Sequence, residues 1–274
     1  MAKLMNRIRV AVIVLNFNGF PYVFDCLKSL SEVTEIGKII VVDNNSKDRS
    51  VFLIKKNFPQ IKIIKNRKNL GFARGNNKAI RIFLRKGYDY IMLLNPDTVV
   101  DKKFLKPLVE LAKSDKKIGI VGPLLKEKVG DKTIYALGAK FNPILGRTKH
   151  IHVKARPLHA SKQEMVSGCA MLVKKEVFEK IGLFDEGFFL YFEDSDFCLR
   201  AGKAGFEIFI EPKSIVYHKI SLSLGGFSLR KIRYNLASNF LFIQKHVKFY
   251  FWPFAFIYLI VLGLKMIISF LLNL

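Results

Sequence analysis

The sequence predicts an α/β fold, in which a mostly parallel β-sheet is flanked by helices and followed by a helical C-terminal tail. Over residues 10–100, short apolar runs alternate with segments whose apolar residues recur at helical spacing. The apolar runs are hydrophobic throughout, which is typical of strands buried on both faces of a parallel sheet. Beyond Gly225 and Gly226 the composition becomes basic and aromatic, so a separate tail is expected there.

The first part of the chain supplies the strands and helices of the expected parallel sheet. The expected strands are Val10–Leu15, Lys38–Val42, Ile61–Ile64 and Tyr90–Leu94. The expected helices between them are Tyr22–Leu30, Ser50–Asn57 and Asn76–Lys86. Each helix begins soon after a strand ends, as in repeated β-α-β units.

The second part of the chain is less regular. Another helix is expected to begin at Asp101, although Pro107 makes its start ambiguous. Residues 126–162 are rich in Gly, Pro, Lys and His without a sustained period, so irregular backbone or short antiparallel strands are expected. A strand at Met165–Val173, a short helix at Lys175–Ile181 and a strand at Phe206–Ile210 complete the fold.

The expected tail has two parts. Residues 228–248 mix basic and apolar side chains, which is typical of an amphipathic helix on an anionic membrane surface. Residues 249–264 carry no charge and the apolar run resumes after Lys265, which together approach the roughly 20 residues of a spanning helix. Lysines before this run favour a cytoplasmic N-terminal side. Two alternatives remain open: the helix dips into the membrane, or it is a buried core helix of an oligomer.

Polar residues follow the expected strands at the points where ligands bind in open parallel sheets. Asn16 and Asn18 follow the first strand, and Asp43 and Asn45 follow the second. The fourth is followed by the Asn95-Pro96-Asp97 sequence. Each cluster alone is also typical of ordinary turns and helix caps. Three such clusters at one sheet edge favour a binding crevice instead.

A glycine-flanked arginine precedes the third expected helix. Gly71, Arg74 and Asn76 lie in the sequence NLGFARGNN, where helix-start amides and a guanidinium would suit a phosphate. The sequence has neither a Walker loop nor a GxGxxG fingerprint after a strand, so the usual ATPase and dinucleotide-binding motifs are absent.

The charge of the chain indicates anionic partners. Lysine and arginine number 46 against 22 aspartate and glutamate, which gives a net charge of +24. Such a field attracts phosphates, nucleic acid or acidic lipid headgroups, although biased codon usage would produce part of the same excess. A nucleic-acid partner is disfavoured, because no nucleic-acid-binding motif is present and carboxylates at the strand ends would repel a phosphate backbone.

The ordered motifs NFNG, VVDNNSKD, NLGFARGNN, LLNPDT, SGCAMLV and FFLYFEDSDFCLRAGKAGF resemble those of family-2 glycosyltransferases with a GT-A fold. The resemblance spans roughly Val10 to His218 and is strongest with the non-processive, rhamnosyltransferase-like branch. The QxxRW motif of processive relatives is missing, since the single tryptophan, Trp252, lies in the tail. The resemblance therefore implies inverting transfer of one sugar from a nucleotide-diphosphate sugar to a glycan or lipid-linked acceptor, as in cell-surface polysaccharide synthesis.

The resemblance also implies a domain division and roles for the strand-end residues. Residues 1–225 would form the GT-A domain, with a nucleotide-binding half to about residue 125 and an acceptor half after it, and 226–274 the tail. The donor-binding residues would be Asn16, Asn18, Asp43, Asn45, Gly71, Arg74, Asn76 and Asn95. This placement implies a protein at the cytoplasmic face of the cell membrane, anchored by its C-terminal hydrophobic segment.

Asp97 is expected to hold Mg²⁺ or Mn²⁺ against the donor diphosphate, with His218 as a second ligand. Many family members carry two aspartates where this chain has Asn95-Pro96-Asp97. One carboxylate is sufficient when phosphate oxygens and water complete the coordination shell. A lone histidine is more often structural than a metal ligand, so the ligand role of His218 stays open.

The expected catalytic base lies in the sequence FEDSD. Inverting transfer needs a carboxylate to take the proton of the acceptor hydroxyl, and the ED motif of the family assigns this role to Asp194. Glu193 and Asp196 would order the loop or contact the acceptor. The alternative is that Asp194 or Asp196 caps the following helix, and both functions are compatible.

Three other classes of protein would share parts of this pattern. A catalytically inactive membrane scaffold that binds sugar nucleotides would keep the same motifs, and a basic nucleic-acid-binding protein would share the charge. A nucleotidyltransferase would bring a GxGTR-type loop near its N-terminus, which Asn16–Gly19 is not.

Overall fold

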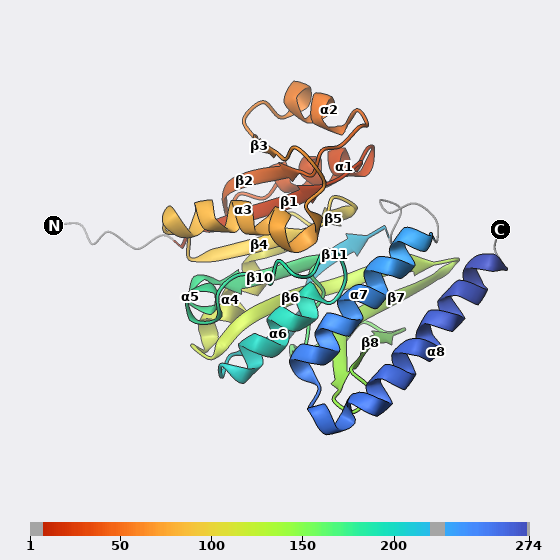
Figure 1. Ribbon diagram of the computed structural model, residues 1–274. Helices are drawn as coiled ribbons and strands as arrows, with labels where there is room; N and C mark the ends of the chain where they lie inside the picture. Colours follow the sequence, from red (N-terminus) through yellow and green to blue (C-terminus); the bar gives the residue numbers. More distant parts are fainter. Residues whose placement is uncertain (1–7, 220–227, 273–274) are drawn as a thin grey trace.

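The computed structural model describes residues 8–219 and 228–272 (Figure 1). Its first part alternates strands and helices as expected from the sequence. The strands are β1 (Val10–Asn16), β2 (Ile36–Asp43), β3 (Lys62–Lys65) and β4 (Tyr90–Leu94). The helices between them are α1 (Tyr22–Ser31), α2 (Ser50–Asn57) and α3 (Gly71–Arg85).

The second part contributes the remaining strands and the helices that precede the tail. The strands are β5 (Thr98–Val100), β6 (Ile118–Val129), β7 (Lys132–Asn142), β8 (Arg147–Val153), β9 (Ser161–Gln163), β10 (Ala170–Lys174) and β11 (Glu207–His218). The helices are α4 (Leu105–Ser114), α5 (Lys175–Ile181) and α6 (Glu193–Lys203). The tail comprises α7 (Leu229–His246), the 3₁₀ turn η2 (Phe249–Phe251) and α8 (Trp252–Leu271).

The central sheet has the strand order β3-β2-β1-β4-β10-β6-β11-β5. The first four of these strands run parallel, β10 is antiparallel to both of its neighbours, and β6 and β11 are parallel to each other. The carboxyl ends of β1, β2 and β4 therefore meet at one edge, where a ligand crevice is expected. Strands β7 and β8 extend the sheet beyond this path as antiparallel hairpins.

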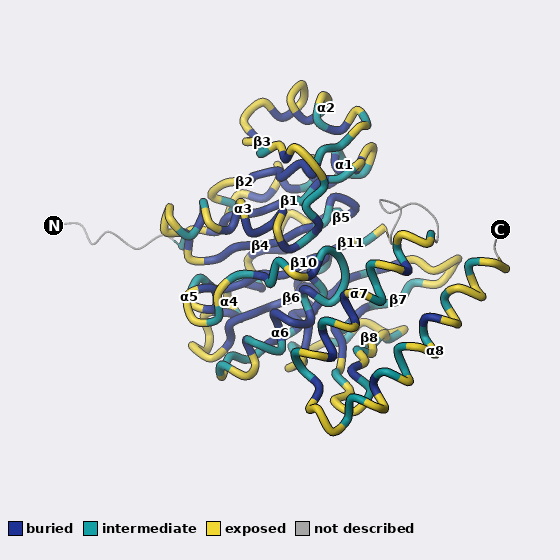
Figure 2. Tube along the Cα trace, viewed as in Figure 1, coloured by how far each residue is buried: buried dark blue, intermediate teal, exposed yellow. Residues whose placement is uncertain are grey.

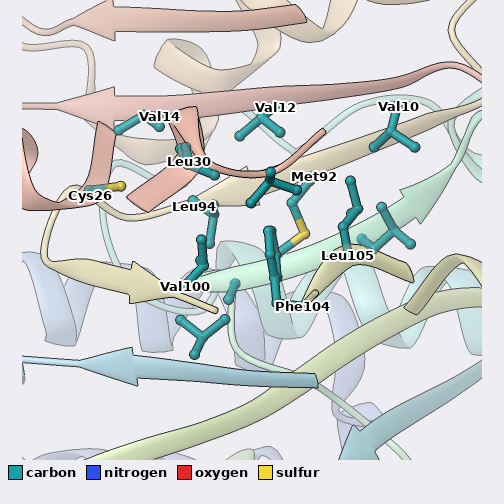
Figure 3. Packing of buried hydrophobic residues seen from close by; sticks show 14 of the residues in the cluster. Val10, Val12, Val14, Cys26, Leu30, Met92, Leu94, Val100, Phe104 and Leu105 are labelled. Atoms are coloured by element: carbon teal, nitrogen blue, oxygen red, sulfur yellow. The ribbon is translucent and has the colours of Figure 1, made fainter. Parts of the chain in front are cut away.

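Both faces of the central strands are buried, as the continuous hydrophobicity of β1 predicts. Val10, Val12 and Val14 pack with α1 and α4 on one face (Figure 3). Ala11 and Ile13 point to the opposite face, where they join a second cluster that includes residues of α3, α5 and α6. Because neighbouring residues of a strand point to opposite faces, apolar side chains at every position fill both layers.

Several expected boundaries were wrong. α3 begins at Gly71 rather than Asn76, and α4 begins at Leu105 rather than Asp101. Pro107 is accommodated because it occupies the first turn of α4, where its missing N–H leaves no helical hydrogen bond unmade. Residues 126–162 form long antiparallel strands instead of short ones.

Two strands expected near the site also differ in length. β10 begins at Ala170 rather than Met165, because the preceding backbone turns to contact α6. β11 continues beyond Ile210 to His218, pairing with β6 over most of its length. This extension carries His218 to the sheet edge where the polar strand ends meet.

The tail packs against the domain through α7, while α8 stays largely exposed (Figure 2). Ile243 of α7 reaches Gly146, where an added Cβ would come within 2.5 Å of its side chain. α8 lies along α7, with the rings of Phe240 and Phe256 stacked at 5.5 Å. Residues 249–271 are long and apolar enough to cross a membrane, with a mean hydropathy of 2.4. The expected domain boundary at residues 225 and 226 lies outside the described residues.

Candidate active site

A cavity of about 770 Å³ opens at the carboxyl edge of the sheet. This volume lies within the range of small-molecule sites. Its walls come from the end of β4, from β6, β8 and β11, from the turn before α6, and from both tail helices. They include Asn95, Asp97, Glu127, Arg147, His150, His152, Glu193, Asp194, His218, Asn235, Asn239, Tyr258, Leu262 and Met266. Asp97 and Asp194, far apart in the sequence, thus share one cavity.

Asp97, His218 and Glu127 form a polar cluster in this cavity. His218 ends β11, where strand pairing sets it opposite Thr98 on one side and Glu127 on the other. Its Nε2 lies 3.7 Å from Asp97 Oδ2, and its Nδ1 lies 2.8 Å from Glu127 Oε1. The pairing of β11 with both β5 and β6 therefore brings the histidine to the carboxylate that follows β4.

The charges of the cluster keep His218 protonated at neutral pH. Burial lowers the pKa of His218, but the neighbouring Cys169, Glu127 and Asp97 outweigh it and raise that pKa to about 11. In the described part of the chain, no group of three or more His, Cys, Asp or Glu side chains is arranged to hold a metal ion. The available set of one carboxylate and one imidazole fits a cation whose other ligands are phosphate oxygens and water.

Asp194 occupies the first turn of α6 and is held by two backbone amides. Gly168 N donates to its Oδ2 at 2.8 Å, and Ser195 N donates to its Oδ1 at 2.7 Å. The preceding residues, Tyr191 and Phe192, have φ angles of 72° and 67°, which non-glycine residues seldom adopt. This strained turn before the helix sets the direction in which Asp194 leaves the backbone.

Helix capping by itself does not explain the contacts of the Asp194 carboxylate. The N-cap of α6 is Phe192, whose side chain makes no capping hydrogen bond. Asp194 accepts one N–H of its own helix, which is the expected capping contribution, and a second from Gly168 in the segment before β10. The carboxylate therefore fastens the helix start to the sheet while it lines the cavity.

The two acidic neighbours of Asp194 have different surroundings. Glu193 lines the cavity and is 5% exposed; burial and the adjacent Asp194 raise its pKa to about 8. Glu193 is therefore mostly protonated at neutral pH and is the weaker candidate for a base. Asp196 is fully buried and bonds Arg200 of its own helix together with Lys245 and His246 of α7. Asp196 was expected either to order the loop or to contact the acceptor, and these buried bonds fit the first role.

Asn16 and Asp43 form a network with two serines at the ends of β1 and β2. Asn16 Nδ2 donates to Asp43 Oδ1 at 2.9 Å, to Ser46 Oγ at 3.0 Å and to Ser50 Oγ at 2.9 Å. Both Asn16 and Asp43 are buried. This network fixes the loop after β2 against β1, beside rather than within the 770 Å³ cavity.

The remaining loop residues lie around this network. Asn18 Oδ1 accepts a hydrogen bond from Lys47 N at 2.8 Å, and Asn45 adopts a left-handed φ of 66°. A Cβ added to Gly19 would lie 3.2 Å from Pro96, so the loop after β1 contacts the Asn95-Pro96-Asp97 turn. Asn95 lines the cavity itself. The two polar regions are therefore neighbours.

Gly71, Arg74 and Asn76 lie inside α3 rather than before it. Gly71 has a φ of +78°, and an added Cβ would come within 2.1 Å of the Phe189 carbonyl oxygen, so this position requires glycine. Arg74 is directed to Glu186, 3.5 Å from Nε to Oε2. Asn76 is buried and bonds Phe72 O in its own helix. Of these three residues, Gly71 allows the start of α3 to pack against the backbone of Phe189, in the segment before Asp194.

Some residues of the site were not expected from the sequence. Glu127, His150 and His152 lie on long strands within the segment expected to be irregular. Had this segment been assigned as a strand, the i, i+2 spacing of the two histidines would have predicted that both side chains point to the same face. Asn235 and Asn239 of α7 also line the cavity, although the tail was expected to serve only the membrane.

The fold and the cavity define a glycosyltransferase of the GT-A type, because strand-end polar loops adjoin a carboxylate–histidine pair and a separate backbone-anchored carboxylate. Residues 11–182 match the model of glycosyl transferase family 2, and the chain belongs to this family. The family and the transferase activity expected from the sequence motifs are thereby confirmed.

Three curated relatives are rhamnosyltransferases. The N-acetylglucosaminyl-diphospho-decaprenol L-rhamnosyltransferase of Mycobacterium tuberculosis is 23% identical over 76% of this chain and 75% of its own length. The dTDP-rhamnosyl transferase RfbF of Shigella flexneri is 29% identical over 80% and 77%. Rhamnosyltransferase WbbL of Escherichia coli strain K12 is 25% identical over 86% and 93%. The expected similarity to the rhamnosyltransferase-like branch is confirmed.

Two solved structures confirm the expected fold class. GalNAc-T7, solved with UDP, GalNAc and Mn²⁺, has a TM-score of 0.64 at 18% identity and covers 85% of this chain. This chain spans about half (48%) of that larger one. A mannosyltransferase from Pyrobaculum calidifontis, solved with GDP-Man and Mn²⁺, has a TM-score of 0.59 at 17% identity, covering 88% of this chain and 65% of its own.

Proposed function

We propose that this glycosyltransferase moves one rhamnosyl residue, with inversion, from a nucleotide-diphosphate sugar to a hydroxyl of a lipid-linked or glycan acceptor in cell-surface polysaccharide synthesis. The observation that carries the proposal is that Asp97 and Asp194 line one cavity. The similarity to three rhamnosyltransferases supports the sugar. The amide side chains of Asn95, Asn235 and Asn239 that line the cavity offer hydrogen-bond partners for sugar hydroxyl groups.

The donor is assigned to the nucleotide-binding half, about residues 1–125. The exposed Asn18 would contact the nucleobase or ribose, whereas the buried Asn16 and Asp43, which were expected to bind the donor directly, would hold the loop after β2 in place. Asn95 lies between this loop and the cavity and would meet the diphosphate or the sugar. The acceptor half, about residues 126–225, supplies Asp194 and the strands on the far side of the cavity.

Asp97 and His218 would hold a divalent cation, Mg²⁺ or Mn²⁺. The donor set fits, since a carboxylate and an imidazole lie 3.7 Å apart and leave room for phosphate oxygens and water. Such a cation, when bound, offsets the negative charge that develops on the departing nucleotide diphosphate. His218 must lose its proton to act as a ligand, and Glu127 at 2.8 Å then holds the ring in place through Nδ1.

Asp194 would act as the general base. Its carboxylate takes the proton of the attacking acceptor hydroxyl as the new bond to the anomeric carbon forms and the bond to the diphosphate breaks. The two amides of Gly168 and Ser195 hold the carboxylate oxygens in position without neutralising them. Glu193, with a raised pKa, is available as a hydrogen-bond donor rather than a base.

A nucleotide panel tests the donor and the cation together. Thermal unfolding of the purified protein would be followed with dTDP, UDP or GDP, each with Mn²⁺, with Mg²⁺ or with EDTA. One nucleotide with a cation is expected to stabilise the fold, by about 2.7 kcal/mol at a hundredfold excess over Kd. His218→Ala should reduce the cation-dependent part of this increase and keep the cation-independent part. Stabilisation by none of the nucleotides would contradict donor binding.

The tail is proposed to attach the enzyme to the cytoplasmic face of the membrane. The outward face of α8 carries exposed apolar side chains, namely Phe254, Ile257, Ile260, Val261, Leu264, Ile268 and Leu271. Its other face packs on α7, where an added Cβ on Gly263 would lie 3.4 Å from Leu236. A helix fastened along the domain in this way favours an in-plane position in the lipid interface over a spanning one.

Loss of outward apolar side chains on α8 should weaken membrane binding. Ile257→Gln combined with Leu264→Gln is expected to lower partitioning into vesicles with anionic lipid about thirtyfold, because each side chain contributes roughly 1 kcal/mol of apolar burial. Co-sedimentation of the full chain measures this directly. Phe52→Gln, which removes an exposed apolar residue on α2, is the matched control. Equal partitioning of the tail variant and this control would contradict attachment through α8.

A further inference from the structure

Three basic side chains of β8 line the cavity that also contains the strand-end carboxylate Asp97. They are Arg147, His150 and His152, which we name the β8 basic group. His150 and His152 stand two residues apart on one strand and therefore point to the same face, with ring centroids 6.3 Å apart. The family motifs and the proposed donor site give these residues no role.

The β8 basic group adjoins the apolar tail helix. The guanidinium carbon of Arg147 lies 5.9 Å from the ring centroid of Tyr258 on α8. Tyr258, Leu262 and Met266 of the same helix line the same cavity (α8 runs beside β8 in Figure 1). Cationic groups and an apolar helix face are thus side by side at one end of the cavity, and the outward face of that helix is exposed and apolar.

The carboxylates that line the cavity do not pair with Arg147, so its positive charge is available to bind an anion. Within residues 8–219 and 228–272, Arg147 makes no ion pair, and its recorded contact is the Tyr258 ring. Glu127 bonds His218 at 2.8 Å and approaches His152 Nε2 at 3.7 Å, so the acidic side of the cavity meets the β8 basic group at His152. A dianionic group would find one permanent cation and two imidazole donors here.

We propose that Arg147, His150 and His152 bind the diphosphate of an acceptor whose sugar is joined through that diphosphate to a lipid chain, with the chain lying on α8. This assignment rests on the proposed function, since it names the acceptor class of the same transferase site. The acceptor sugar then extends toward Asp194, which lines the same cavity. In this arrangement the β8 basic group binds the diphosphate, and α8 contacts the apolar chain.

Binding of a lipid diphosphate that lacks any sugar tests this assignment without relying on catalysis. The full-length protein in detergent would be titrated with farnesyl diphosphate, with farnesol and with inorganic pyrophosphate. Farnesyl diphosphate is expected to bind at least tenfold more tightly than either of the other two, because each of them lacks one of the two recognised parts. Arg147→Ala should weaken farnesyl diphosphate binding tenfold or more, and Arg147→Lys should restore part of the loss.

Matched measurements separate this subsite from the donor site and from general charge. Lys149→Ala removes an exposed cation from the same strand that does not line the cavity, and should change farnesyl diphosphate binding less than twofold. Arg147→Ala should leave the thermal shift produced by nucleoside diphosphate and cation unchanged. Equal loss of both ligands in Arg147→Ala would assign Arg147 to the donor, and unchanged farnesyl diphosphate binding would remove the subsite. Either result leaves the Asp194 and nucleotide tests standing, so failure here is distinguishable from failure of the proposed function.

Discussion

Replacement of Asp194 by Asn should lower kcat for sugar transfer about 10²–10⁴-fold, the usual contribution of a general base. The amide cannot take the proton of the acceptor hydroxyl, although its oxygen can still accept one of the two backbone N–H groups that hold the carboxylate. Release of nucleotide diphosphate in the presence of acceptor measures the rate. The KM for the donor should change little, since the backbone amides that hold Asp194 belong to Gly168 and Ser195 and not to the loops after β1 and β2.

Two controls make the Asp194 result interpretable. Asp131→Asn changes an exposed aspartate in the turn between β6 and β7, and should keep the wild-type rate. The nucleotide-dependent thermal shift of Asp194→Asn should equal that of the wild type, which shows that the donor site is intact. A rate within a few fold of wild type would exclude Asp194 as the base. An inactive scaffold would show donor binding with no transfer in either protein.

The layered sheet was predictable because its signal is local. β4 and the first six residues of β1 are hydrophobic at every position, and the observed bounds of both strands differ from the expected ones by a residue or less. The start of α3 was missed because Gly71 and Gly75 weaken a helical pattern, whereas the fold requires glycine at position 71 for contact with the Phe189 carbonyl. The length of β7 and β8 was missed because an exposed hairpin has no continuous apolar run.

Some residues of the candidate site could likewise be predicted from local sequence patterns, and others could not. The position of Asn95 at the cavity and of Asn16 and Asp43 beside it was predictable, because these residues end or follow apolar strands whose carboxyl ends must meet. Glu127 could not, since its place beside His218 depends on the parallel register of β6 and β11, which no local pattern encodes. The role of the tail in the cavity was hidden for a related reason. Asn235 and Asn239 line the cavity because α7 docks on the domain, where its Lys245 and His246 bond the buried Asp196 of α6.

Asp196→Asn should destabilise the protein by about 3–5 kcal/mol, because it removes one partner of a buried ionic cluster. The carboxylate is fully buried and accepts from Arg200 Nε at 2.8 Å, Lys245 Nζ at 2.7 Å and His246 Nε2 at 2.9 Å. Without its charge, Arg200 and His246 lose their buried carboxylate partner, while Lys245 keeps its pair with Asp185. The unfolding temperature in detergent should fall by on the order of 10 °C.

The pH dependence of this loss follows from the pKa of Asp196. Burial raises that pKa, but His246, Lys245 and Arg200 together bring it well below the ordinary range of an aspartate. The carboxylate therefore contributes its full stability above about pH 4, the ordinary pKa of an unfolded aspartate, and loses it as the pH falls through the lower folded value. The difference in unfolding temperature between the wild type and Asp196→Asn should be constant near neutral pH and shrink in acid.

Glu179→Gln, which breaks an exposed pair with Lys175 on α5, should change stability by less than about 0.5 kcal/mol. An Asp196 variant as stable as this control would show that α7 is held to the domain by its apolar contacts alone.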